Sequence, residues 1–170
     1  MSSQKVVLIT GASSGVGQST ARLLSQTGYK VFGTSRNPAA AAAIPNVKML
    51  ALDVTSAHSV AACVKAVAND AGRIDVLVNN AAYELAGALE EISIEEAKAQ
   101  FETNFFGVVR MVNAVLPYMR QQKQGQIINV SSLSGVSSIS WASTPPASSR
   151  WKAIQMPYGW KSDRSIYTYR

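Results

Sequence analysis

The sequence predicts an α/β fold built on a doubly wound parallel sheet, and two observations lead to that prediction. Short apolar and β-branched runs alternate along the chain with longer segments whose apolar residues recur at helical spacing. A glycine-rich turn joins the first such run to the first helical segment. Strands that alternate with helices pair in parallel through right-handed crossovers. The 170 residues are therefore expected to form one layered domain with about five strands.

The strands are expected where short runs are richest in Val, Ile and Leu. The first run, KVVLIT, has no polar residue between its ends, which is typical of a strand buried on both faces. The later runs IDVLV and QIINV have a similar character. The expected strands span residues 5–10, 30–35, 47–52, 74–78 and 126–130.

Three helices are expected between these strands. The first is expected to stop at Gly28 and the second at Gly72, because glycine after a periodic apolar run is a helix-stop signal. The third is the longest and carries apolar residues at helical spacing from Phe101 to Leu116. The expected helices span residues 17–27, 58–71 and 94–120, and the alanine run at 39–43 is expected to begin a short helical turn.

Composition excludes several classes of protein. The chain is 47% hydrophobic and 15% charged, which fits a globular domain rather than a disordered one. No apolar run approaches the ~18 residues of a membrane span, and the first residues do not form a basic and then apolar leader. Cys63 is the only cysteine, which suits a reducing compartment, so we expect a cytoplasmic protein. We expect no metal site, because no histidine accompanies the glutamates between residues 90 and 96.

The net charge of +6 does not indicate nucleic-acid binding. Five basic residues and one acidic residue lie between residues 140 and 170, so most of the excess charge belongs to that segment. The same segment contains all three tryptophans and shows no helical or strand period from Ser143 onward. We therefore expect a domain over residues 1–139, followed by an irregular tail over residues 140–170, with no nucleic acid as a partner.

The turn TGASSGVG at residues 10–17 has the context of a phosphate-binding site, because it follows a strand and opens a helix. Gly11 can adopt a backbone conformation closed to other residues. Gly15 and Gly17 allow the backbone to approach a pyrophosphate and the helix to pack on the sheet. The helix N-terminus adds N–H groups and the positive end of the helix dipole. The first domain is thus predicted to be a Rossmann-like NAD(P)-binding domain.

Five motifs in order resemble those of the short-chain dehydrogenase/reductase family, over about Lys5 to Ile139. They are TGxxxGxG at 10–17, LDV at 52–54, NNAA at 79–82, ETNFFG at 102–107 and NVSSLSG at 129–135. Ala82 replaces the glycine of the family's NNAG motif. The resemblance implies that Asn104 and Ser132 belong to the catalytic set and that Asp53 contacts adenine. It implies a coenzyme site formed by Gly11, Ser13, Ser14, Gly15, Val16, Gly17, Arg36, Asp53, Val54, Asn80 and Ala81.

The end of the second expected strand indicates which coenzyme is preferred. An acidic residue there would hold the ribose hydroxyls of NAD, but Ser35 occupies that position and Arg36 follows it. A guanidinium can form charge-assisted hydrogen bonds with a 2′-phosphate. We therefore predict a preference for NADP(H), with a solvated loop residue as the alternative interpretation of Arg36.

The family's acid/base pair is absent at its expected place. In the family, a tyrosine about 13 residues after the serine moves the proton, and a lysine four residues further on lowers its pKa. From Ser132 this spacing leads to Pro145 and Ser149, neither of which can do this. Asn104 could also be only a polar helix residue, and the serines near residue 132 could be turn residues.

A change of reading frame accounts for this loss. Back-translation of residues 143–162, read from the third base of each codon, permits YSASKxxLEGxSDALRLE. Two glutamates and one alanine of that peptide are forced by the code. Because the peptide resembles the family's catalytic helix, we infer that the gene is frameshifted near Ile139–Ser140 and that the tail is an out-of-frame translation.

The sequence therefore favours an NADP(H)-dependent oxidoreductase of carbonyls or secondary alcohols by family, truncated and catalytically impaired in this chain. The alternative is a non-catalytic dinucleotide-binding protein or a nonfunctional truncated product. A sugar epimerase is disfavoured because it would need the same tyrosine and lysine. With the C-terminal strands missing, the fifth strand is expected to become an open sheet edge, and the family's homo-oligomer surface is expected to be largely lost.

Overall fold

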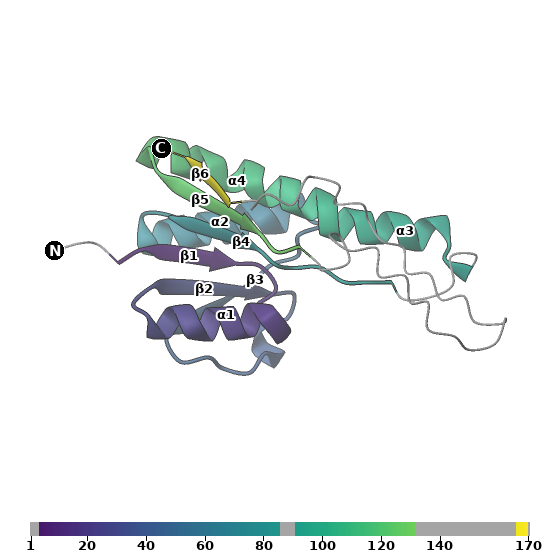
Figure 1. The fold of residues 1–170 in the computed structure, drawn as a ribbon, viewed down its shortest axis with the longest axis horizontal. Coiled ribbons are helices and arrows are strands. Elements are labelled where there is room, and N and C mark those ends of the chain that lie inside the picture. The colour runs from purple at the N-terminus through teal and green to yellow at the C-terminus, as the bar shows by residue number, and fades with distance from the viewer. Residues whose placement is uncertain (1–3, 86–90, 132–165, 170) are drawn as a thin grey trace.

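The computed structural model describes residues 4–85, 91–131 and 166–169, and its centre is a six-stranded sheet in the order β3-β2-β1-β4-β5-β6 (Figure 1). The five strands β1 to β5 are parallel, as the sequence predicts. All four residues of β1 are buried, which fits its place at the centre of the sheet. The strands are β1 (Val6–Ile9), β2 (Lys30–Ser35), β3 (Val47–Ala51), β4 (Val76–Asn79), β5 (Gly125–Asn129) and β6 (Ile166–Tyr169).

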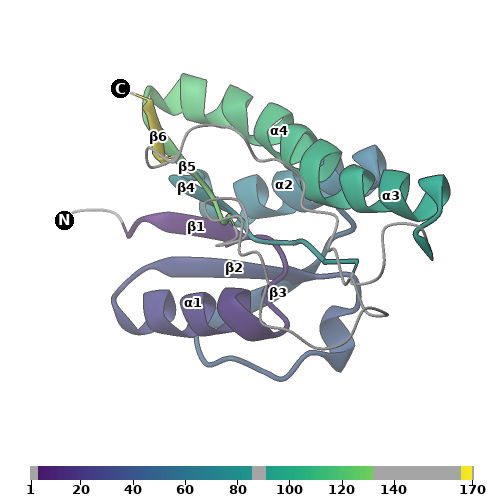
Figure 2. The same ribbon diagram turned by 45° about the vertical axis from the view of Figure 1, so that its right-hand side comes forward.

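Helices cover both faces of the sheet, so the predicted doubly wound α/β fold is confirmed (Figure 2). On one face, α1 packs over β1, β2 and β4 through Ala21. On the other face, α2 and α4 pack against the sheet and each other through residues such as Val64 and Met111. The helices are α1 (Gly15–Gln26), α2 (Ala57–Ala71), α3 (Ile94–Phe101) and α4 (Gly107–Gln122), with a 3₁₀ turn η1 (Pro38–Ala40) and a π-helical turn η3 (Glu102–Phe106).

Side-chain caps define where two of the helices begin. The Ser56 hydroxyl accepts the N–H of Ser59 and caps α2. Ser93 and Glu96 form a capping box at α3, in which each side chain accepts the other residue's backbone N–H. None of the helices within the described ranges has the length and apolar character needed to cross a bilayer.

The long helix expected over residues 94–120 is interrupted in the structure. α3 and α4 are separated by η3, in which the Gly107 N–H donates to the carbonyl of Glu102, five residues back, instead of that of Thr103, four residues back. The extra residue rotates the buried face of α3 relative to that of α4. Gln100 is buried before the turn, whereas Gly107, Met111, Val115 and Met119 are buried after it. The apolar residues of the sequence recur at helical spacing on both sides of this turn. For that reason the sequence predicted a single helix.

The expectation of an open edge at β5 is wrong for the described residues. β6 pairs antiparallel with β5, with Gly125 opposite Tyr169 and Ile128 opposite Ile166. β6 also contradicts the expectation that no strand forms after Ser143. The rest of the expected irregular tail lies outside the described residues.

Asp75 joins the amino ends of β1 and β4. Its carboxylate is 5% exposed, accepts the Val6 N–H at 2.8 Å and binds the Arg73 guanidinium, with Nε at 2.9 Å from Oδ2. The carboxyl ends of the parallel strands lie at the opposite edge of the sheet. There the chain leaves β1 toward β2 on one side and β4 lies on the other, which is where open α/β sheets bind ligands.

Candidate functional site

The turn after β1 closes tightly on the loop after β4. Gly11 has a φ of +68°, and a Cβ on it would lie 2.9 Å from the Ala81 Cα. Gly17 is buried at the start of α1, where a Cβ would lie 2.3 Å from the Gly11 carbonyl oxygen and 2.4 Å from Asn80 Nδ2. Real Cβ atoms essentially never come within 3.0 Å of such neighbours. Both positions therefore require glycine, as the sequence predicts for a phosphate turn.

Thr10 and Asn80 connect this turn to the loop after β4 by hydrogen bonds. The backbone N–H groups of Asn80 and Ala81 each donate to Thr10 Oγ1 at 2.9 Å. Asn80 Nδ2 donates to the carbonyls of Thr10 at 3.0 Å and Gly11 at 2.9 Å. The Asn80 amide thus holds the shape of the turn. Thr10 was not among the predicted site residues, although it is the first residue of the glycine motif.

The start of α1 presents backbone N–H groups at this turn. Ser14 is the N-cap, and its hydroxyl makes no capping hydrogen bond with the described residues. Ser14, Gly15 and Val16 are exposed, while the Ser13 carbonyl accepts Gln18 Nε2 at 3.3 Å. The first N–H groups of a helix have no intrahelical acceptor and lie at the positive end of the dipole. This arrangement can bind the oxygens of a phosphate.

Ser35 and Arg36 lie where β2 ends beside the turn. The Ala12 N–H donates to the Thr34 carbonyl at 2.8 Å, which joins the turn to β2. The Asn37 N–H donates to Ser35 Oγ at 3.2 Å. Arg36 is exposed, so its guanidinium is accessible to an anionic group.

Asp53 lies in the loop between β3 and α2, and Thr55 holds its carboxylate. Oδ1 accepts the Thr55 hydroxyl at 2.7 Å and the Thr55 N–H at 2.9 Å. These hydrogen bonds, and with them the charges of Arg36 and Arg110, hold the pKa of Asp53 below its ordinary value. The carboxylate is therefore an anionic acceptor at neutral pH. Thr55 was not among the predicted site residues, although a hydroxyl two residues after an aspartate is a common turn signal.

Val54 packs under the same loop against α4. Val54 is 8% exposed, and a Cβ on Gly107 would lie 2.8 Å from Val54 Cγ2. Arg110 binds the Glu102 carboxylate of η3 and reaches to 3.5 Å from the Val54 carbonyl. The loop that carries Asp53 is thus fixed against the helix that follows the π-helical turn.

Asn104 lies in η3, and its amide binds the backbone of the loop after β4. Oδ1 accepts the Tyr83 N–H at 3.1 Å, and Nδ2 donates to the Tyr83 carbonyl at 2.7 Å. Gln100, which is 2% exposed, donates from Nε2 to the same carbonyl at 3.2 Å. The family motif in the sequence indicates Asn104, whereas nothing in that motif indicates Gln100 or Tyr83. The spacing of four residues between two amide side chains was the available signal.

Ser132 lies outside the described residues, and so do positions 145 and 149. β5 nevertheless leads the chain to the same edge of the sheet. Asn79 Nδ2 donates to Asn129 Oδ1 at 2.9 Å, and the Val130 N–H donates to the Asn79 carbonyl at 2.9 Å. The structure therefore gathers the glycine turn, Asp53 and Asn104 at the carboxyl edge, and the role of Ser132 stays a prediction.

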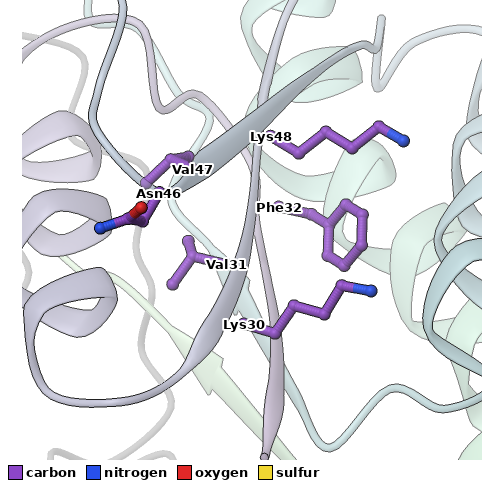
Figure 3. Close-up of a pocket in the computed structure, with 6 residues that line it drawn as sticks. All are labelled: Lys30, Val31, Phe32, Asn46, Val47 and Lys48. Atoms are coloured by element: carbon purple, nitrogen blue, oxygen red, sulfur yellow. The ribbon is translucent and has the colours of Figure 1, made fainter.

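A surface hollow of about 310 Å³ lies at the other end of the sheet, where β2 and β3 begin. Figure 3 shows Lys30, Phe32 and Lys48 pointing to one side of the strands and Val31 to the other. Both lysines bind the Asp70 carboxylate, at 2.5 and 2.6 Å. We attribute this hollow to the sheet surface and its ion pairs, because it lies away from the glycine turn. Across the described ranges, no three metal-ligating His, Cys, Asp or Glu side chains come together.

Residues 5–150 match the short chain dehydrogenase family. The chain belongs to this family. The match begins at the first strand and extends past Ser132, so it includes every predicted site residue.

Curated relatives resemble the chain over most of its length. A 3-ketodihydrosphingosine reductase of Bacteroides thetaiotaomicron is 51% identical over 135 residues, which are 79% of this chain and 49% of that protein. Human retinol dehydrogenase 8 is 40% identical over 147 residues, which are 79% of this chain and 46% of the relative. The chain thus spans about half the length of these relatives.

Solved structures of related proteins have the same fold. A short-chain dehydrogenase from Streptomyces avermitilis superposes with a TM-score of 0.74 at 38% identity, covering 79% of this chain and 52% of that one. An actinorhodin polyketide ketoreductase variant with NADPH gives 0.72 at 32% identity, covering 81% and 56%. ElxO with NADP bound gives 0.70 at 32% identity, covering 79% and 58%.

Proposed function

We propose that this chain binds NADP(H) at the carboxyl edge of its sheet, in the manner of a short-chain dehydrogenase. The observation that carries the proposal is the close contact of Gly11 and Gly17 with the loop that holds Asn80. Because neither glycine has a side chain, the backbone at the start of α1 is open to a ligand. A pyrophosphate requires that close approach and the N–H groups beside it. Gly11, Ser13, Ser14, Gly15, Val16 and Gly17 are assigned to the phosphates, Asp53 and Val54 to the adenine, and Asn80 and Ala81 to the wall beside the turn.

The preference for the phosphorylated coenzyme rests on Ser35 and Arg36. Ser35 has no carboxylate to repel a 2′-phosphate, and the exposed Arg36 guanidinium can bind one through charge-assisted hydrogen bonds. Two of the related structures contain NADP or NADPH. The coenzymes of these related proteins support, by analogy, a preference of this chain for NADP(H).

The chemistry proposed for the parent protein is reversible reduction of a small-molecule carbonyl to a secondary alcohol, with hydride supplied by the bound coenzyme. On this chain, Ser132 would hydrogen-bond the substrate oxygen. Asn104 holds the loop at Tyr83 in place beside the site. Neither Pro145 nor Ser149 can move the proton that must accompany the hydride. We therefore propose that the chain binds coenzyme but does not turn over substrate.

The first experiment is a titration with NADPH and NADH, followed by coenzyme fluorescence. We expect tighter binding of NADPH, and we expect Arg36→Ala to weaken NADPH about tenfold while leaving NADH unchanged. Arg22→Ala is the matched control, because it removes an exposed arginine from the middle of α1. Equal affinity of the wild type for both coenzymes would refute the preference.

The second experiment tests turnover with 3-ketodihydrosphingosine, chosen because the relative that is 51% identical is named a 3-ketodihydrosphingosine reductase. NADPH binding without oxidation of NADPH supports a non-catalytic dinucleotide-binding chain. Conversion of the ketone to its alcohol would overturn the proposed loss of activity.

A further inference from the structure

The carboxylate of Asp53 is fixed on one side only. Both hydrogen bonds from Thr55 go to Oδ1, at 2.7 Å from the hydroxyl and 2.9 Å from the N–H. Among the residues that the structure describes, none donates a hydrogen bond to Oδ2. Because one oxygen is held by two donors, rotation of the carboxylate would break a hydrogen bond to a charged group.

The backbone of this loop is fixed as well. The Asp53 N–H donates to Ser59 Oγ at 2.9 Å, and the Ser56 N–H donates to the Asp53 carbonyl at 3.2 Å. Ser59 lies in the first turn of α2, whose cap is Ser56. The loop is thus joined to α2, and within the described ranges Thr55 is the one residue that donates hydrogen bonds to the Asp53 side chain.

Positive charges near Asp53 come from two other elements. Arg36 follows β2, and Arg110 lies on α4, where it also binds Glu102. After the Thr55 hydrogen bonds, these two charges help hold the pKa of Asp53 below its ordinary value of 3.8. Oδ2 is therefore an anionic acceptor, which pairs with an N–H donor and not with a carbonyl.

We propose that Thr55 is a positioning residue that aims Asp53 Oδ2 at the exocyclic amine of the coenzyme's purine. It would make the site select adenine over a purine with an oxygen at that place. This inference rests on the proposed function and extends it from Asp53 to a residue that does not itself touch the coenzyme. Removal of the Thr55 hydroxyl frees the carboxylate to rotate, which weakens the selection without removing the acceptor.

The test compares binding of NADPH with that of its hypoxanthine counterpart, in which a carbonyl replaces the amine. We expect the wild type to favour NADPH and Thr55→Val to reduce that ratio about tenfold, with Thr55→Ser restoring it. Thr27→Val is the matched control, because the exposed Thr27 hydroxyl donates, among the described residues, only to the carbonyls of Leu23 and Leu24 within α1. Carboxyl titration by NMR should show the Asp53 pKa moving up toward 3.8 in Thr55→Val.

The outcomes separate the two proposals. If the wild type binds neither nucleotide, the proposed function fails and this inference fails with it. If the wild type binds NADPH but Thr55→Val keeps both the selectivity and the Asp53 pKa, only the role of Thr55 is overturned. If Thr55→Val does not fold, Thr55→Ala provides the same two measurements, judged in the same way.

Discussion

Gly17→Ala places a methyl group where the structure has no room for one. The new Cβ would lie 2.3 Å from the Gly11 carbonyl oxygen and 2.4 Å from Asn80 Nδ2, so the turn or the amide must move. Moving Asn80 breaks its hydrogen bonds to Thr10 and Gly11, which are worth about 1 kcal/mol each. Overpacking adds about 1–3 kcal/mol, and the better helix propensity of alanine returns about 1 kcal/mol. We expect a net loss of about 3 kcal/mol in the free energy of unfolding.

Thermal unfolding and NADPH titration together measure this effect. For a chain of this size, about 3 kcal/mol corresponds to a melting temperature lower by roughly 10 °C. Gly15→Ala is the matched control, because nothing lies within 4 Å of its Cβ and only the positive φ of 56° is strained. That variant should lose about 1 kcal/mol. A Gly17→Ala chain that melts and binds NADPH like the wild type would refute the assigned closure of the turn.

Three further predictions concern the ion pairs and the tail. Asp75→Asn breaks the ion pair between the buried Asp75 carboxylate and Arg73, far from the glycine turn. It should lower the free energy of unfolding, measured in urea, by about 2 kcal/mol without changing the affinity for NADPH. An unchanged urea midpoint would contradict this. Hydrogen bonds from two lysines lower the pKa of Asp70 to about 2, so its stabilisation is present above about pH 4 and is lost as the pH falls toward 2. Urea midpoints of Asp70→Asn should therefore fall less than those of the wild type over that range, and parallel curves would count against the pairing. A chain whose second reading frame follows Ile139 should gain NADPH-dependent ketone reduction, and its inactivity in that assay would count against the frameshift.

Much of the fold could be predicted because it depends on short-range patterns. The apolar runs predicted the five parallel strands, and glycine at residues 28 and 72 marked the ends of two helices. The same patterns could not reveal the π-helical turn at Glu102–Phe106, because one inserted residue leaves the apolar composition unchanged. They also could not reveal β6, since its pairing with β5 joins residues about forty apart in the chain.

The candidate site divides in a similar way. The glycine spacing and the family motifs identified Gly11, Gly17, Asp53 and Asn104. The partners of these residues were not identified, because Thr10 meets Asn80 across 70 positions and Asn104 meets Tyr83 across 21.

By itself, the sequence determined the alternation of strands and helices and the glycine turn, because each depends on residues close together in the chain. Tertiary structure alone decided that the Asn80 amide holds the turn and that β6 covers β5. It also decided that Gln100 and Asn104 both donate hydrogen bonds to the Tyr83 carbonyl, in the loop after β4. Those contacts arise only when distant segments meet at one edge of the sheet, and no local period encodes which donors and acceptors will face each other there.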